Sequence, residues 1–273
     1  MKTCMNGATT MPYPLEEDIR AAGNAGFEQI EIWLDKMNKY LETHSEGDLK
    51  RLLDANGVSA ATICPFWMVM FGDREPQLAA IGRAAEIASR IGCPTLLVCP
   101  DAPPPTMSTD AAFEHAGQVA REYGDVAAKH GVRIAIEPLG THPFVPGCSE
   151  ALRILEIADH PALGLMMDTF HYYKSGVPME SVRKIPADKL LIVHVNDCED
   201  RPRQELQDSH RLYLGEGILP LTETLQTLKA IGYEGALSVE IFRPEYWERP
   251  IDRISRESFE SLRKAVAAAG MEV

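Results

Sequence analysis

The sequence predicts an α/β protein that folds as a single (β/α)8 TIM barrel, and three observations predict it. A short unit recurs along the chain, in which a helical pattern ends near glycine and a run of apolar, often β-branched residues follows. Eight such runs can be found, and the length of 273 residues is close to the ~250 typical of this barrel. No G-x-G-x-x-G pattern follows the first run, which disfavours a doubly wound open sheet.

The eight predicted strands follow one another in chain order. The first lies in "KTCMNGAT" near the amino terminus, and the sixth and seventh lie in "ALGLMMDT" and "LLIVHVND". The other five begin where a helix meets glycine, in "NAGFEQIEIW", "ANGVSAATIC", "RIGCPTLLVC", "KHGVRIAIEP" and "AIGYEGALSVEI". Helical patterns separate the strands, for example over 75–91, 108–130 and 220–231. Because no linker, low-complexity segment or change of composition interrupts the chain, residues 1–273 are expected to form one domain.

Composition and charge restrict the classes of function. Apolar residues make up 45% of the chain, enough for a large core, and no apolar run approaches the ~20 residues of a membrane span. The first ten residues lack the pattern of a secretion signal, and the six cysteines are dispersed without a C-x-x-C pair. Reduced thiols and a cytoplasmic location are therefore expected. The formal charge of -13 would repel polyphosphate, which disfavours nucleic-acid binding and favours a small neutral or metal-chelating ligand.

Polar residues gather at the carboxyl ends of the last four predicted strands, where barrel proteins carry their active sites. One residue per strand lies inside or directly after an apolar run, and these are Glu137, Asp168, His194 and Glu240. A lone carboxylate within a buried strand, as Glu240 would be, is costly unless it is paired, protonated or bound to a metal. Three carboxylates and one imidazole suit a divalent ion such as Mn, Zn, Co or Mg. An internal ion-pair network is the alternative.

Other residues near these strands allow two interpretations each. His171 either belongs to the same site or is an ordinary loop histidine. Asp197 either orients His194 or ends its strand as a turn former. The segment "CPFWMVMF" after the third strand either lines an apolar side of a pocket or packs into the core.

Together these residues resemble the xylose isomerase-like TIM barrel family of sugar isomerases and epimerases. The resemblance runs over the whole chain and depends on "MKTCMNGATT", "IEPLGTHP", "DTFHYY", "HVNDCED" and "VEIFRPEYW". Within the family, the opening decamer and the last of these segments are most similar to the isomerases of inosose (2-keto-myo-inositol).

The resemblance implies a metal-dependent isomerase that acts on an α-hydroxyketone through an enediolate. It implies substrate contacts from His171 and Arg211, while Glu31 occupies a position that is often acidic in these barrels. Glu137 and Glu240 are also expected to act as the catalytic acid/base pair, because their strands lie three steps apart and could flank a substrate. The implied cofactor is one divalent metal ion (Mn, Zn, Co or Mg), with the ligands Glu137, Asp168, His194 and Glu240.

Several other functions start from the same residues. Dehydration of inosose or 3-dehydroshikimate and 3-epimerisation of a free ketose begin with the same proton abstraction. An endonuclease IV-like DNA repair enzyme shares this barrel, but it needs extra histidine ligands, and the third and fourth predicted strands here end without histidine. A non-catalytic binding protein is the remaining alternative. The expected partner is a small sugar or cyclitol, without nucleic acid or membrane, and a homodimer is the expected oligomer.

Overall fold

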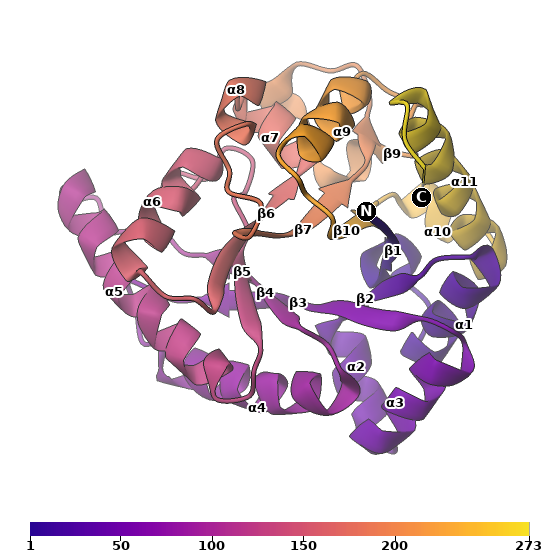
Figure 1. Ribbon diagram of the computed structural model, residues 1–273, viewed down its shortest axis with the longest axis horizontal. Helices are drawn as coiled ribbons and strands as arrows, with labels where there is room; N and C mark the ends of the chain where they lie inside the picture. Colours follow the sequence, from indigo (N-terminus) through magenta and orange to yellow (C-terminus); the bar gives the residue numbers. More distant parts are fainter. Residues whose placement is uncertain (273) are drawn as a thin grey trace.

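The computed structural model describes residues 1–272, and its central strands close into a parallel barrel (Figure 1). Neighbouring strands follow the order β1-β10-β7-β6-β5-β4-β3-β2 around the barrel. They are β1 (Lys2–Asn6), β2 (Gln29–Trp33), β3 (Ser59–Met68), β4 (Thr95–Pro100), β5 (Arg133–Ile136), β6 (Leu163–Asp168), β7 (Leu190–Val195) and β10 (Ala236–Val239). The TIM barrel predicted from the sequence is confirmed, and β10 closes it by pairing with β1.

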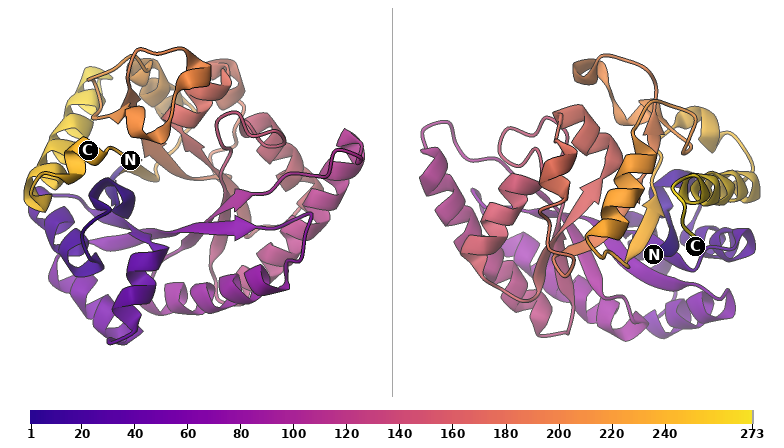
Figure 2. Two further views of the ribbon diagram at one scale, coloured as in Figure 1. Left: turned by 180° about the vertical axis from the view of Figure 1, so that it is seen from behind. Right: turned by 45° about the horizontal axis from the view of Figure 1, so that its top comes forward.

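Helices surround the barrel, as the view from behind in Figure 2 shows. They are α1 (Leu15–Ala25), α2 (Leu34–Leu41), α3 (Glu46–Ala55), α4 (Glu75–Ile91), α5 (Thr109–Ala128), α6 (Cys148–Ala158), α7 (Thr169–Ser175), α8 (Met179–Val182), α9 (Leu221–Ala230), α10 (Pro244–Trp247) and α11 (Ile251–Ala268), with 3-10 turns η1 (Gly7–Thr10), η2 (Arg203–Glu205) and η3 (Asp208–His210). The predicted helix 75–91 coincides with α4, and the predictions 108–130 and 220–231 extend slightly beyond α5 and α9. Within residues 1–272, no helix is both long and apolar enough to cross a membrane.

Local sequence explains where these helices begin and end. Helix α3 begins after Ser45, whose hydroxyl accepts the backbone N–H of Asp48 while the Asp48 carboxylate accepts the backbone N–H of Ser45. Helix α4 ends at Gly92, which has a φ of 77° and donates its N–H to the carbonyls of Ala88 and Ser89. A left-handed residue at this place favours glycine. The glycine-to-strand joints of the sequence therefore have a simple physical cause.

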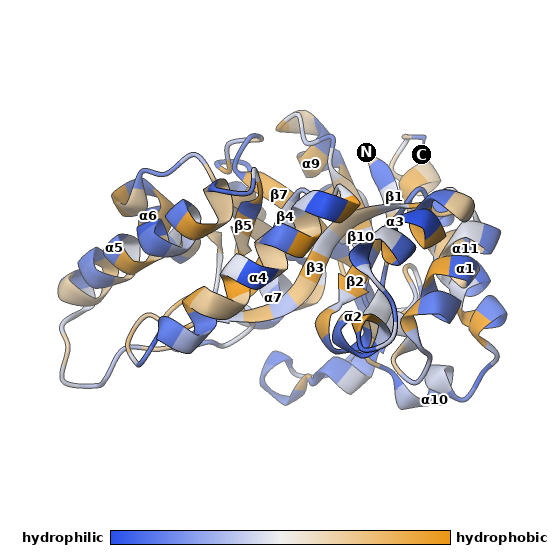
Figure 3. Cartoon of the chain, turned by 90° about the horizontal axis from the view of Figure 1, so that it is seen from below, coloured by the Kyte–Doolittle hydropathy of each residue, from blue (hydrophilic) through white to orange (hydrophobic). Residues whose placement is uncertain are grey.

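Two layers of apolar side chains hold the barrel together. The inner layer consists of small or slender side chains, among them Cys4, Ala61, Leu97, Ala135 and Ile192. A larger layer fills the space between the strands and the surrounding helices. In Figure 3 the central strands are mostly hydrophobic, whereas the helices carry both hydrophobic and hydrophilic residues. This arrangement is the expected one for parallel strands covered by amphipathic helices.

A two-stranded antiparallel ribbon stands outside the barrel after β7. It pairs β8 (Asp197–Cys198) with β9 (Arg211–Leu212). The Asp197 carboxylate accepts the backbone N–H groups of Cys198, Gly215 and Leu219 at 2.8–3.0 Å. Asp197 therefore organises this loop. The alternative, that it orients His194, has no support from a hydrogen bond between the two residues in the described structure.

We expect matched glycine substitutions in two neighbouring helices to differ in their effect on stability. A Cβ on Gly117 in α5 would lie 2.6 Å from the Cβ of Ile157, whereas a Cβ on Gly82 in α4 would lie 3.5 Å from Val126 Cγ1. Gly82→Ala should raise the free energy of unfolding by up to about 1 kcal/mol through helix propensity. The free energy of unfolding of Gly117→Ala should be about 1–3 kcal/mol lower than that of Gly82→Ala, because the added methyl group overpacks the contact with Ile157. Denaturant unfolding measures both values, and equal stabilities would contradict the close packing of α5 on α6.

Candidate metal centre

The four predicted ligands meet at the mouth of the barrel. Asp168 ends β6 and His194 lies within β7, while Glu137 and Glu240 directly follow β5 and β10. The last two still donate their backbone N–H groups to the neighbouring strands. Glu240 thus stands at the end of its strand and not in the middle of it, as the apolar run had suggested. All four side chains are buried, and one ligand atom from each lies within 4.8 Å of the others.

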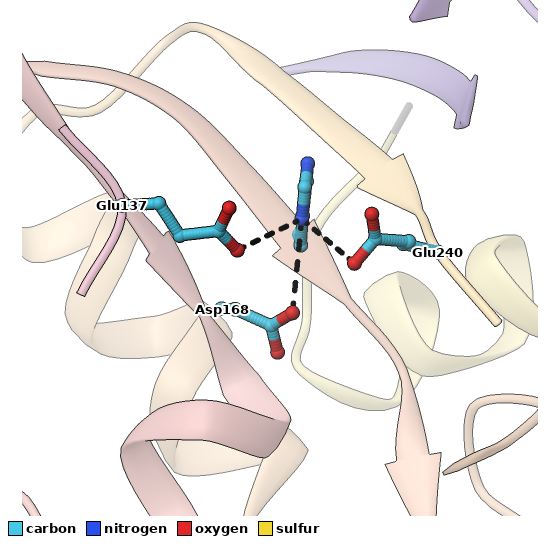
Figure 4. A group of neighbouring side chains, drawn as sticks. Glu137, Asp168 and Glu240 are labelled. Carbon is cyan, nitrogen blue, oxygen red and sulfur yellow. Dashed lines mark ion pairs between the residues drawn. The ribbon is translucent and has the colours of Figure 1, made fainter. Parts of the chain in front are cut away.

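The side chains of Glu137, Asp168 and Glu240 point toward a common point (Figure 4), and His194 reaches that point. Its Nδ1 atom lies 3.0 Å from Glu240 Oε2, 3.7 Å from Asp168 Oδ2 and 3.9 Å from Glu137 Oε1. This nitrogen is buried and accepts or donates no hydrogen bond within residues 1–272. A buried ring nitrogen without a hydrogen bond, facing three carboxylates, fits a divalent cation bound between them. One nitrogen and three oxygens allow Zn, Mn, Co or Mg.

Glu31 fixes the orientation of the His194 ring from the opposite side. It lies in β2, is fully buried, and accepts hydrogen bonds from His194 Nε2 and Ser238 Oγ, both at 2.8 Å, and from the Thr62 hydroxyl. Burial opposes its ionisation, but His194 and these donors lower the pKa of Glu31 to about 2. A carboxylate that accepts the Nε2 proton leaves Nδ1 as the nitrogen that can bind a metal.

The surrounding carboxylates give the centre a strong negative field. Burial disfavours a charged His194, yet Glu240 and Glu31 hold its pKa well above the usual value. For Glu137, burial is the main cause that raises the pKa, to about 8, with Glu240 and Asp168 adding to it against the opposing effects of His194 and Arg211. A divalent cation in this position would be stabilised by the same field.

Arg211, the first residue of β9, reaches into the cluster from the ribbon. Its side chain is buried, and Nη1 donates to Asp168 Oδ2 at 2.6 Å and to Glu240 Oε2 at 2.9 Å. Its Nε and Nη2 atoms both donate to Asp208 Oδ1. Burial opposes the ionisation of Asp168, but Arg211 holds the pKa of Asp168 well below its usual range. Arg211 therefore links two predicted metal ligands, Asp168 and Glu240, to Asp208.

His171 also lies at this site and is not an ordinary loop histidine. It belongs to the first turn of α7, which Asp168 caps by accepting the backbone N–H groups of Phe170 and His171. His171 Nε2 lies 3.3 Å from Arg211 Nη2 and 3.9 Å from Glu137 Oε1. Burial lowers the pKa of His171 to about 4, so its ring is neutral near pH 7.

A cavity of about 170 Å³ opens beside the cluster. Its polar wall is formed by Glu137, His171, His194, Asp208, Arg211 and Glu240. Its apolar wall includes Trp33, Pro65, Leu97, Leu139 and Phe242. Both interpretations of "CPFWMVMF" hold for different residues, because Cys64 and Pro65 line the cavity while Phe66 and Met68 pack in the core.

Sequence reasoning missed several neighbours of the predicted ligands. Asn6 donates its side-chain N–H to Glu240 Oε1 at 3.1 Å, and the Cys99 thiol donates to Glu137 Oε2 at 3.4 Å. Asp208 was missed as well. Asn6 and Cys99 stand at the ends of their strands, which was the one signal that could have found them. Asp208 begins the 3-10 turn η3 in the loop between β8 and β9 and carries no such signal.

The fold and the site together define a class, that of TIM-barrel proteins with a cluster of carboxylates and a histidine at the mouth that could hold a metal ion. The chain belongs to the xylose isomerase-like TIM barrel family, whose model matches residues 19–265. The family resemblance found in the sequence is thus confirmed.

Two known enzymes and one solved structure are similar to this chain. An inosose isomerase of Halalkalibacterium halodurans is 30% identical over 257 residues, which is 91% of this chain and 90% of that protein. A 3-dehydroshikimate dehydratase of Pseudomonas putida is 27% identical over 91% of this chain but only 39% of its own length. The crystal structure of the IOLI protein with a binding zinc atom superimposes with a TM-score of 0.90, at 28% identity, and covers 98% of this chain and 99% of that one.

We expect Glu31→Gln to weaken metal binding without loss of the barrel. The amide cannot supply the negative charge that supports the Nε2–H of His194, so affinity for added Zn or Mn should fall roughly 10- to 100-fold. Isothermal titration of the metal-free protein measures the affinity, and circular dichroism reports the fold. Glu28→Gln is the control, because Glu28 is an exposed residue just before the same strand and bonds to Thr3. Equal affinities in Glu31→Gln and wild type would contradict the role of Glu31.

Proposed function

We propose that this protein is a metal-dependent isomerase of α-hydroxyketone sugars or cyclitols, with inosose (2-keto-myo-inositol) as its substrate. The observation that carries the proposal is the placement of the Glu137 and Glu240 carboxyl groups, which point toward one another from two sides of the site (Figure 4) and lie 3.9 Å and 3.0 Å from His194 Nδ1. Their strands, β5 and β10, are separated around the barrel by β6 and β7. A ring placed between two carboxyl groups can lose a proton to one and receive a proton from the other.

A metal ion fits the ligand set, and its chemistry is simple to state. Bound by Glu137, Asp168, His194 and Glu240, a divalent ion would supply Lewis-acid polarisation of the ketone and hydroxyl oxygens. The side chains of the protein supply the rest, which is proton transfer and the stabilisation of charge on the substrate oxygens.

Glu137 and Glu240 are the groups that move the proton. The isomerisation removes the proton from the carbon that bears the hydroxyl group and returns a proton to the former carbonyl carbon. The hydroxyl proton passes to the former carbonyl oxygen, so that ketone and hydroxyl group change places. Burial raises the pKa of both carboxyl groups, that of Glu137 to about 8. A raised pKa helps a carboxyl group to hold the transferred proton during the reaction.

Arg211 and His171 stabilise the charge that develops on the substrate oxygens. Both line the cavity, and their side-chain nitrogens lie 3.3 Å apart. Arg211 is held by Asp168, Glu240 and Asp208, so it presents a guanidinium group that does not need to reorganise during the reaction. The neutral His171 ring can donate one hydrogen bond to an oxyanion.

The proposal also includes the class of ligand and the location of the protein in the cell. The size of the cavity, about 170 Å³, suits a small sugar or cyclitol, and the charge of -13 disfavours a nucleic acid. A cytoplasmic location agrees with six cysteines that are all free and buried. The proposed oligomer is a homodimer, as expected from the sequence.

Dehydration is the second candidate, because a 3-dehydroshikimate dehydratase is among the similar proteins. Both reactions begin with proton abstraction beside a ketone, and they differ in whether a hydroxyl group then leaves. The products therefore distinguish them.

Proton NMR of 2-keto-myo-inositol in D2O tests the proposal. With purified protein and added Mn, deuterium should enter at the carbon beside the ketone, and a second inosose should appear. A chelator should stop both processes, because the ligand cluster then lacks its ion. Loss of water from the substrate would identify a dehydratase, and the absence of exchange with every divalent metal tried would refute the isomerase.

We expect Glu240→Gln to keep the fold and to lose nearly all turnover. The amide cannot accept or return a proton, and general acid/base catalysis contributes roughly 10²–10⁴ in rate. Turnover and thermal unfolding are measured together, with Glu234→Gln, an exposed residue just before β10, as the control that stays active. Activity of Glu240→Gln near the wild-type level would show that Glu240 does not carry the proton.

A further inference from the structure

Strand β3 is the longest strand of the barrel, and it extends beyond the end of β2. It has ten residues, whereas the other barrel strands have four to six. Its last residues still pair with β4, with Trp67 opposite Cys99 and Met68 opposite Pro100. Strands β3 and β4 therefore form a taller wall on one side of the mouth.

The register places Trp67 on the cavity side of this wall. Side chains opposite one another in adjacent parallel strands face the same side, and Cys99, the partner of Trp67, lines the cavity. Phe66 and Met68, on the other side, pack in the core between strands and helices.

Trp67 is nevertheless far from buried. Its exposed fraction is 57%, the largest among the big apolar side chains of residues 1–272. Isolated exposed apolar residues are common on protein surfaces. This one differs because its partner in β4, Cys99, lines a cavity to which Pro65, Leu97 and Leu139 contribute apolar side chains.

The two walls of the cavity match the two kinds of surface on a cyclitol. Arg211, His171 and Asp208 supply polar groups on one wall. The cavity residues that β2, β3 and β4 contribute are Trp33, Cys64, Pro65, Leu97 and Cys99, none of them acidic or basic, and Trp67 lies further along β3. The edge of a cyclitol ring carries hydroxyl groups, whereas its flat faces expose C–H groups that pack well on an indole.

We propose that Trp67 is a substrate-binding residue whose indole packs against the C–H face of a ring-shaped substrate and holds it against the polar wall. This inference rests on the proposed function, since it concerns the same cavity. It also gives a basis for specificity, because an open-chain ketose has no rigid flat face to offer. Trp67 should therefore favour cyclitols over open-chain ketoses.

Steady-state kinetics with 2-keto-myo-inositol test this inference. Trp67→Ala should raise KM roughly five- to thirtyfold with kcat within about twofold of wild type, as expected for lost binding that is equal in ground and transition states. Trp67→Phe should restore most of the affinity. Ile218→Ala, which removes another exposed apolar side chain, is the control with unchanged kinetics. An unchanged KM in Trp67→Ala, or a loss of kcat alone, would overturn the inference.

A binding experiment separates this inference from the isomerase proposal. Acrylamide quenching of wild type and Trp67→Phe isolates the emission of Trp67 from that of Trp33 and Trp247. Saturating myo-inositol with Mn should protect Trp67 from quenching, even if the wild type does not turn over inosose and the proposed function fails. Absence of protection overturns the inference whatever the activity. A change of oligomeric state in Trp67→Ala, measured by light scattering, would also overturn it, because Trp67 would then serve a contact between copies of the chain.

Discussion

The concentration of carboxylates around the His194 ring is the constraint on which the rest of the site depends. Glu31 faces one ring nitrogen, and Glu137, Asp168 and Glu240 face the other. Like charges at such short distances in a buried place repel one another strongly, so they can remain together only if some carboxyl groups hold a proton or positive charge lies among them. Arg211 supplies part of it. The unbonded Nδ1 atom of His194 marks the point where a divalent ion would supply the rest.

Several parts of the structure serve this cluster from a distance. The β8–β9 ribbon carries Arg211 into the site, and Asp197 closes the ribbon through backbone hydrogen bonds. Asp168 divides its two oxygens between tasks, since Oδ1 caps α7 and Oδ2 faces His194 and Arg211. The cap also fixes the place of His171 in the first turn of that helix. Geometry at the mouth thus depends on loops as much as on strands.

The sequence predicted the barrel and the four central residues because both depend on local patterns. Each strand is an apolar run after a helix end, and Glu137, Asp168, His194 and Glu240 stand out against such runs. The contact of Glu31 with His194 spans 163 positions, and a local pattern cannot reveal which charged groups meet across a barrel. Arg211 was found through family resemblance alone. Asp208 was missed because it lies in a loop, where polar residues are ordinary.

The closure of the barrel also has a consequence for how the protein acquires its site. Each of the four cluster residues comes from a different segment, and Glu240 follows β10, which is held in place by pairing with β1 at the other end of the chain. A partly folded chain whose two ends have not yet met would lack Glu240 and the Asn6 amide beside it. The complete ligand cluster therefore exists only in the completed ring of strands, and a divalent ion bound by that cluster would favour the ring over any open intermediate.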